Sequence, residues 1–191
     1  MMRELWLVRH GETEWSLSGA HTGRTDIPLL PSGREGGAAV GRYLAGRPFG
    51  LVLVSPMQRA RETCRLAGYG DSAIVEPNLS EWFYGDYEGR TSTEIQKEKP
   101  GWSIWAAGPL NGETISQVAA RADAVIARAL SADGDVALFA HGHILRILTA
   151  RWLGLPPDAG RLFALGTASV SSLGYERDTQ VITRWNLSVS E

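Results

Sequence analysis

The feature that most constrains this chain is a short apolar run, Leu5–Val8, followed directly by Arg9, His10 and Gly11. Such a run is typical of a buried strand, and the glycine begins a polar loop. In open α/β sheets, ligands bind at the carboxyl ends of the strands. A histidine there can serve as a nucleophile, and an arginine fork suits a pair of phosphate oxygens. On their own, these residues fit a solvated loop equally well.

Further strand patterns follow along the chain. Apolar runs at 51–54 and 136–140 predict two more buried parallel strands. Ile74 and Val75 predict a weak one. The segment at about 162–187 alternates polar and apolar residues, which indicates one or two strands, antiparallel at an edge of the sheet.

Helical patterns separate these strands. A capping box from Ser32 to Glu35 predicts one helix, and Pro56 at a first-turn position predicts another. Apolar residues at helical spacing predict a third over 115–130, and a fourth is expected after His141. This alternation predicts an α/β fold, a three-layer sandwich on a mostly parallel sheet with an antiparallel edge.

Two long segments, 11–31 and 77–112, carry no clear pattern and are expected to be loops. The second is rich in aromatic residues, which argues against disorder and favours a functional loop. Within it, Trp102 and Trp105 fit the core and a substrate-binding wall equally well. The length of 191 residues and the hydrophobic content of 43% suggest a single domain over 1–191.

Composition excludes several classes of protein. A formal net charge of -2 gives no basic field for nucleic acid or an anionic membrane, so neither is an expected partner. The single cysteine, Cys64, cannot form an internal disulfide or a thiolate metal site. No signal-peptide pattern or membrane-length apolar stretch is evident, which favours a soluble, cytoplasmic protein. A homodimer is left open.

Polar residues that could carry chemistry follow the predicted strands. They are Arg9, His10, Arg59 and Arg61 as alternatives, Glu81 and His141. Because parallel strands end at one edge of the sheet, these groups should meet there. Such a set suits phosphoryl transfer from a monoester: arginines hold the non-bridging oxygens, one imidazole attacks phosphorus, and the other hydrogen-bonds an equatorial oxygen. The acid would protonate the leaving alkoxide, and amides of the last helix would point into the site.

Other polar residues have simpler interpretations. The pair His141 and His143 could suggest a metal site, but no nearby acid or cysteine pattern supports it, so neither a metal nor a cofactor is expected. Arg61, two residues after Arg59, could take its place at the phosphate or be a surface cation, and the residues alone do not choose between them. The remaining acids of the aromatic segment are interpreted as solvated: Glu88, Glu94 and Glu98.

The same residues lie within motifs that run in order along most of the chain. The motifs are Leu7–Trp15, Thr22-Gly23, Ser55–Ala60, Leu79–Glu81 with Gly85–Gly89, and Phe139–Gly142. Together they resemble the histidine phosphatase superfamily, the phosphoglycerate mutase-like proteins. The resemblance implies that His10 becomes phosphohistidine and that Arg9, Arg59 and His141 complete a phosphate pocket. It also implies that Glu81 donates a proton and then acts as the base for water.

Within that family, the residues around 82–89, 102–105, 111–114 and 139–146 resemble the sedoheptulose-bisphosphatase-like sugar phosphatases and the short bacterial acid phosphatases. The chain departs from the mutases at Ser16, where they usually have asparagine, and in its short span between Glu81 and His141. The expected activity is therefore hydrolysis of small phosphomonoesters, above all sugar phosphates, through a phosphohistidine on His10. A mutase-type phosphotransferase and a catalytically silent phospho-ligand-binding module are the alternatives.

We also expect residues around the reactive phosphate to contact the substrate. They are Thr13, Ser16, His21, Thr22, Gly23, Tyr84, Gly142, His143 and Arg146. His143 and Arg146 can share one helix face, and His21 could approach the same space. A cationic patch there would suit a second anionic group on the substrate. Equally, each of the three could have a purely structural role.

Overall fold

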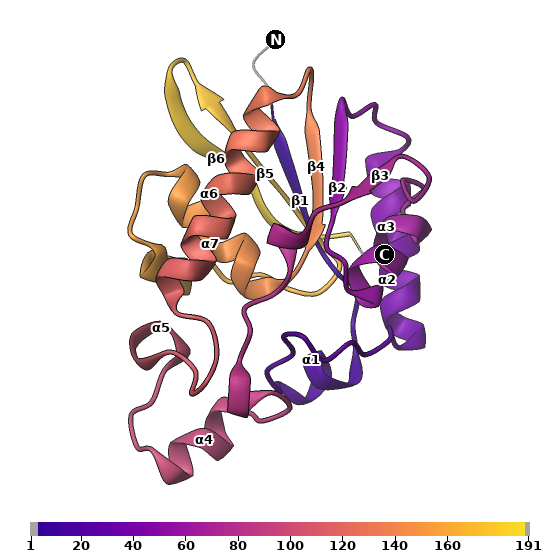
Figure 1. The fold of residues 1–191 in the computed structure, drawn as a ribbon. Helices are drawn as coiled ribbons and strands as arrows, with labels where there is room; N and C mark the ends of the chain where they lie inside the picture. Colours follow the sequence, from indigo (N-terminus) through magenta and orange to yellow (C-terminus); the bar gives the residue numbers. More distant parts are fainter. Residues whose placement is uncertain (1–3, 190–191) are drawn as a thin grey trace.

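A six-stranded sheet organises the computed structural model, which describes residues 4–189. The strand order is β3-β2-β4-β1-β5-β6, with β1 through β4 mutually parallel and β5 antiparallel to both its neighbours. Figure 1 shows the sheet between two groups of helices. The strands are β1 (Leu5–Arg9), β2 (Leu51–Val54), β3 (Ala73–Val75), β4 (Val136–Ala140), β5 (Ser169–Glu176) and β6 (Thr179–Ser188).

Strand β1 lies inside the sheet, between β4 and β5. Its side chains alternate between the two faces, as the pleat requires. Leu5 and Leu7 pack into one hydrophobic core, and Trp6 and Val8 pack into the other. An apolar residue at every position, rather than at every second one, is therefore explained by burial on both faces.

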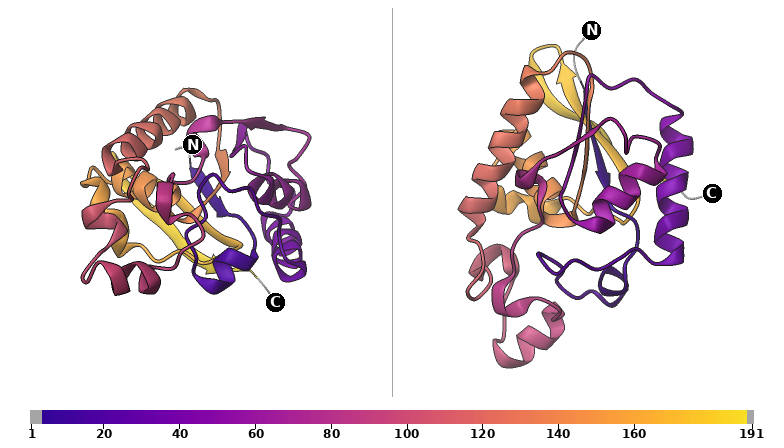
Figure 2. Two further views of the ribbon diagram at one scale, coloured as in Figure 1. Left: turned by 60° about the horizontal axis from the view of Figure 1, so that its bottom comes forward. Right: turned by 45° about the vertical axis from the view of Figure 1, so that its right-hand side comes forward.

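Four longer helices cover the sheet. Helices α2 (Pro31–Leu44) and α3 (Gln58–Leu66) pack together over one face, and α6 (Ile115–Ser131) and α7 (Gly142–Trp152) pack together over the other. Both views in Figure 2 keep these pairs on opposite sides of the strands. The predicted three-layer α/β sandwich with an antiparallel edge is confirmed.

Two predicted helix starts are wrong. Helix α2 begins at Pro31, with Leu30 as its N-cap and no side-chain cap, because the proline ring sets a helical φ at the first position. The hydroxyl of Ser32, predicted to cap this helix, donates instead to the carboxylate of Glu12 over 2.6 Å. Helix α3 begins at Gln58 rather than near Pro56.

The two patternless segments contain short helices that sequence patterns did not predict. They are α1 (Glu14–Ser18), α4 (Ser92–Glu98), α5 (Ile104–Ala107) and the 3-10 turns η1 (Pro77–Leu79) and η2 (Gly85–Tyr87); a further turn, η3 (Pro157–Leu162), follows α7. Thr13 and Thr91 begin α1 and α4 with capping boxes. One or two turns give too little periodicity to be recognised by pattern.

The loop after β1 is pressed against the start of α2. A Cβ on Gly11 would lie 2.1 Å from the carbonyl oxygen of Gly33, and a Cβ on Gly33 would lie 2.1 Å from that of Glu12. Only glycine permits this approach, which fixes the loop that carries His10. Between residues 4 and 189, no helix is long and apolar enough to cross a membrane.

Candidate active site

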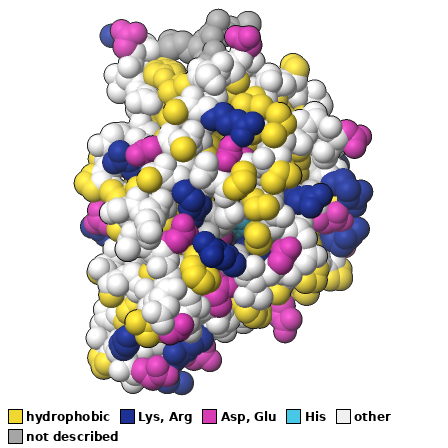
Figure 3. Space-filling model, viewed as in Figure 1, with side chains coloured by type: hydrophobic (Ala, Val, Ile, Leu, Met, Phe, Trp, Pro, Cys, Tyr) yellow, Lys and Arg dark blue, Asp and Glu magenta, His cyan; other side chains and the backbone are white. Residues whose placement is uncertain are grey.

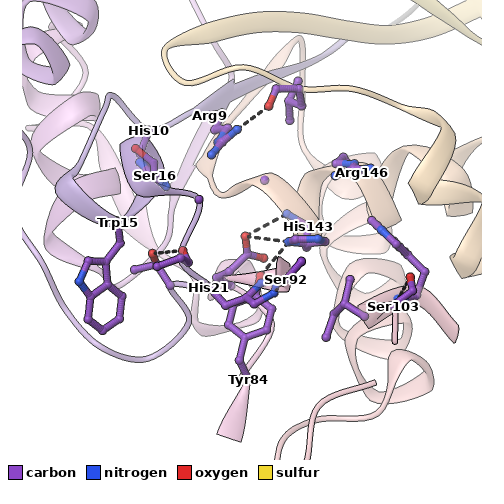
Figure 4. Close-up of a pocket in the computed structure, with 18 of the residues that line it drawn as sticks. Arg9, His10, Trp15, Ser16, His21, Tyr84, Ser92, Ser103, His143 and Arg146 are labelled. Carbon is purple, nitrogen blue, oxygen red and sulfur yellow. Dashed lines mark hydrogen bonds and ion pairs between the residues drawn. The ribbon is translucent and has the colours of Figure 1, made fainter. Parts of the chain in front are cut away.

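A cavity of about 400 Å³ opens where β1 ends and α7 begins. Its walls come from the loop after β1, from the segment between Glu81 and Trp105, and from the first turns of α7 (Figure 4). Histidine atoms are visible in a hollow near the middle of the face in Figure 3. Ten of the predicted site residues line it: Arg9, His10, Ser16, His21, Thr22, Glu81, Tyr84, Gly142, His143 and Arg146.

His10 is held as a neutral imidazole. Its Nδ1 lies 2.7 Å from the carbonyl oxygen of Gly11, and because a carbonyl only accepts, Nδ1 carries the proton. Burial lowers the pKa of His10 well below its usual value, and the charges of Arg9 and Arg59 lower it further. The other ring nitrogen, Nε2, is thereby left with its lone pair, as a nucleophile requires.

Arg59 and His141 do not line the cavity but lie buried beside it. The rings of His10 and His141 are 5.1 Å apart between centroids. Arg59 Nε donates to Nδ1 of His141 over 3.2 Å, so Nε2 of His141 carries the proton and donates to Ser55 Oγ at 2.6 Å. Burial, and then the charge of Arg59, lowers the pKa of His141 well below its usual value.

The Arg59 guanidinium is fixed by main-chain oxygens. Its Nη2 donates to the carbonyls of Thr22 and Gly23 over 3.1 and 2.9 Å, and its Nη1 donates to that of Thr25 over 3.2 Å. Gly23, predicted to touch substrate, does not line the cavity, and its carbonyl holds Arg59 beside it. Thr13, likewise predicted, is fully buried and caps α1.

Arg9 lines the cavity and contains a buried donor that is not used within residues 4–189. Its Nη1 donates to the carbonyl of Leu165, whereas its buried Nε has no hydrogen-bond partner among residues 4–189. A buried donor without a partner costs free energy, so it favours a ligand that supplies an acceptor. A phosphate oxygen is such an acceptor.

Glu81 sits at the N-terminus of α7. Its carboxylate accepts hydrogen bonds from the backbone N–H groups of Trp82, His143 and Ile144, each over 2.9 Å. The amides of α7 were expected to face a ligand directly, and that expectation is wrong for two of them, because Glu81 occupies them. The carboxylate is consequently immobile at the cavity wall.

The far side of the cavity carries less positive charge than expected. Burial lowers the pKa of His21 to about 4, and burial followed by the charge of Arg146 lowers that of His143 well below its usual value. Both rings are therefore neutral near pH 7, and the predicted three-cation patch reduces to Arg146. Its guanidinium stacks on Trp105, 4.7 Å from the ring centroid, and donates to the carbonyls of Gly160 and Arg161.

Several wall residues were not predicted from sequence. Trp15, Ser92, Gln96 and Ser103 line the cavity from the short helices and the residues next to them. Ser55, which follows β2, orients His141; its position after an apolar strand was the available signal. Trp102 and Trp105 belong both to the core and to the cavity wall.

Glu88 was interpreted as solvated, and that interpretation is wrong. Its carboxylate accepts hydrogen bonds from the backbone of residues 23–25 and of Tyr84.

Within residues 4–189, no group of three histidine, cysteine, aspartate or glutamate side chains is arranged to hold a metal ion. Both ring nitrogens of His141 are engaged by protein atoms.

Known proteins share this sequence and architecture. The family model described as histidine phosphatase superfamily (branch 1) matches residues 5–188. An acid phosphatase of Mycobacterium tuberculosis is 39% identical over 176 residues, covering 90% of this chain and 86% of the relative. Sedoheptulose 1,7-bisphosphatase of Saccharomyces cerevisiae is 40% identical over 183 residues, covering 78% of this chain and 67% of the relative.

A solved structure of a protein from Mycobacterium tuberculosis superimposes with a TM-score of 0.92 at 37% identity and covers 98% of both chains. This similarity and the family model confirm the phosphoglycerate mutase-like fold. Since the family model spans nearly all of the described residues, the chain belongs to the histidine phosphatase superfamily, branch 1.

Proposed function

We propose that this protein is a metal-independent phosphatase that hydrolyses small phosphomonoesters through a phosphohistidine on His10. The observation that carries the proposal is the state of His10, a neutral imidazole whose Nδ1–H is bound to Gly11 and whose Nε2 keeps its lone pair. The acid phosphatase and sugar bisphosphatase relatives support hydrolysis.

In the first step, His10 Nε2 attacks phosphorus and the bond from phosphorus to the ester oxygen breaks. Glu81, in its protonated form, gives its proton to the departing alkoxide, which leaves as an alcohol. Transfer brings the phosphoryl oxygens next to His10, where the charges of Arg9 and Arg59 can stabilise them, and His141 can donate to one of them once its Nε2–H leaves Ser55.

In the second step, water attacks phosphorus while Glu81 accepts one of its protons. The bond from phosphorus to Nε2 breaks, inorganic phosphate leaves, and both side chains return to their starting protonation states. The buried guanidinium groups supply the positive charge that a metal ion supplies in other phosphatases.

We propose sugar phosphates as the substrate class. The cavity beyond the reactive histidine has an indole wall from Trp102 and Trp105, hydroxyl and amide groups, and one cation, Arg146. Apolar sugar faces can stack on indoles, hydroxyls can pair with the polar groups, and a second anionic group can pair with the arginine.

A trapping experiment tests the mechanism. The enzyme is mixed with a radiolabelled phosphomonoester, quenched, and treated with acid or with alkali. We expect an acid-labile, base-stable label on the wild type and none on His10→Ala. Equal labelling of His10→Ala would assign the nucleophile to another residue, and no turnover of any ester would favour a silent binding module.

A substrate panel tests the reaction class. Sedoheptulose 1,7-bisphosphate, p-nitrophenyl phosphate and 3-phosphoglycerate are incubated with and without 2,3-bisphosphoglycerate and with a chelator. We expect release of inorganic phosphate that is unaffected by the chelator. Interconversion of phosphoglycerates that depends on the bisphosphate would indicate a mutase instead.

A further inference from the structure

The carboxylate of Glu88 organises a loop that lies far from it in sequence. Its Oε2 accepts from the amides of Gly23 (3.2 Å) and Thr25 (3.0 Å) and from the Thr25 hydroxyl (2.8 Å). Its Oε1 accepts from the amides of Arg24 (3.1 Å) and Tyr84 (3.2 Å). One anionic side chain therefore orients three successive amides of the segment 23–25.

The opposite side of the same loop holds Arg59. When the amides of 23–25 point toward Glu88, the carbonyls of Thr22, Gly23 and Thr25 are available to the guanidinium. The loop is also tied to α3, because Asp26 Oδ1 accepts from the amide of Gln58 over 2.9 Å. It thus transmits the position of Glu88 to Arg59.

Arg59 in turn sets the state of His141. Its Nε–H points at Nδ1 of that ring, which requires the proton of a neutral imidazole to be on Nε2. We propose that Glu88 is a positioning residue of the active site, which fixes the Arg59 fork and, through it, the tautomer of His141. This inference rests on the proposed function only for the measurements of kcat, because the tautomer of His141 can be observed without turnover.

The geometry explains why a carboxylate and a glycine stand at these two positions. Five donors converge on Glu88, and only an ionised carboxylate offers two acceptor oxygens and no donor. A Cβ on Gly23 would lie 2.1 Å from Glu88 Oε1 and 2.5 Å from the carbonyl oxygen of Trp82. The amide of residue 23 can approach the carboxylate only if no side chain intervenes.

The first test is Glu88→Gln, which keeps the shape but replaces one acceptor oxygen with a donor. Glu94→Gln is the matched control, because Glu94 also accepts from a backbone amide and a threonine hydroxyl but caps α4 and does not contact the Arg59 loop. With p-nitrophenyl phosphate, we expect kcat to fall about tenfold to a hundredfold for Glu88→Gln and less than about twofold for the control.

The second test separates positioning from general support of the fold. In an Arg59→Lys background, which lacks the fork, adding Glu88→Gln should lower kcat by less than about threefold further. Histidine-ring NMR should show His141 as the Nε2–H tautomer in the wild type and a mixture of both tautomers in Glu88→Gln. An unchanged His141 tautomer in Glu88→Gln would overturn the inference. So would a double variant whose loss of kcat equals the product of the losses in the two single variants.

If Glu88→Gln does not fold, Thr25→Val removes only the hydroxyl contact at an exposed side chain. We then expect a smaller loss of kcat and a smaller change of the His141 tautomer ratio in the same direction. The absence of both effects would overturn the inference. Failure of the wild type to hydrolyse any ester would reject the proposed function. The NMR comparison would still decide the role of Glu88.

Discussion

The hydroxyl of Tyr84 lies 2.7 Å from Nδ1 of His143, in the wall of the cavity. Burial, and then the carboxylates of Glu81 and Glu88, raises the pKa of Tyr84 well above its usual value, so the phenol keeps its proton. Neutral His143 pairs with this hydroxyl through Nδ1. His143 is therefore a neutral hydrogen-bonding side chain rather than a cation.

Tyr84→Phe should destabilise the protein, because Nδ1 of His143 loses its hydrogen-bond partner. We expect the free energy of unfolding to fall by about 1–3 kcal/mol. Urea unfolding near neutral pH measures the change, and Tyr43→Phe, at a side chain exposed on α2, should change it by less than about 0.5 kcal/mol. Equal effects of the two variants would argue against a Tyr84–His143 hydrogen bond.

Arg146→Ala should separate two classes of substrate. A lost charge-assisted contact to a second anionic group lowers kcat/KM about tenfold to a hundredfold on a sugar bisphosphate. The same variant should change kcat/KM on p-nitrophenyl phosphate by less than about threefold, because that ester has nothing to place beside Arg146. A common loss on both substrates would mean that Arg146 supports the pocket rather than the distal group.

Glu81→Gln should distinguish substrates by their leaving groups. An alkoxide needs a proton as it departs, so the variant should lose about a hundredfold or more in kcat on sugar phosphates, but about tenfold or less on p-nitrophenyl phosphate.

Because the pKa of His10 lies well below its usual value, moderate acidification leaves the nucleophile neutral. Because the leaving alkoxide takes its proton from a protonated acid, sugar phosphates should be hydrolysed faster below neutral pH. The measurement is the pH-rate profile of kcat, and a flat profile would argue against a general acid of this kind.

Acidification should also destabilise the fold. Burial lowers the pKa values of all four histidines. Below about pH 6.5 the unfolded chain therefore binds protons at histidines that stay neutral in the folded chain, which favours unfolding. Each should cost about 1.3 kcal/mol of unfolding free energy between about pH 7.5 and about pH 5.5. Urea unfolding without phosphate should show this, and His21→Gln should reduce the pH-dependent loss by about 1 kcal/mol.

The long strands and helices could be predicted because burial sets the pattern of apolar residues along each of them. Leu5–Val8 and Val136–Ala140 are apolar at every position because both faces of each strand are covered, and α6 shows the spacing of a one-sided helix. The start of α2 could not be predicted, since Ser32 has the right local pattern and the structure gives its hydroxyl to Glu12 instead. Competition from a distant partner leaves no mark in the local sequence.

The site was predictable to the extent that strand ends carry it. Arg9, His10 and His141 follow directly from where β1 and β4 stop. Glu88 was missed because its partners in the segment 23–25 lie 63–65 residues earlier in the chain, and the residues next to Glu88 do not indicate them. The charge of His21 was misjudged because protonation depends on burial, which a loop sequence does not reveal.

The order of synthesis delays the pairing of β1 with its neighbours in the sheet. Strand β1, which directly precedes His10, is synthesised before its two neighbours in the sheet, β4 and β5. Until Val136–Ala140 has emerged, β1 has no strand beside it, and an unpaired apolar strand is prone to aggregation. A nascent chain that stops before that point carries His10 without α7, whose first turns form one wall of the cavity.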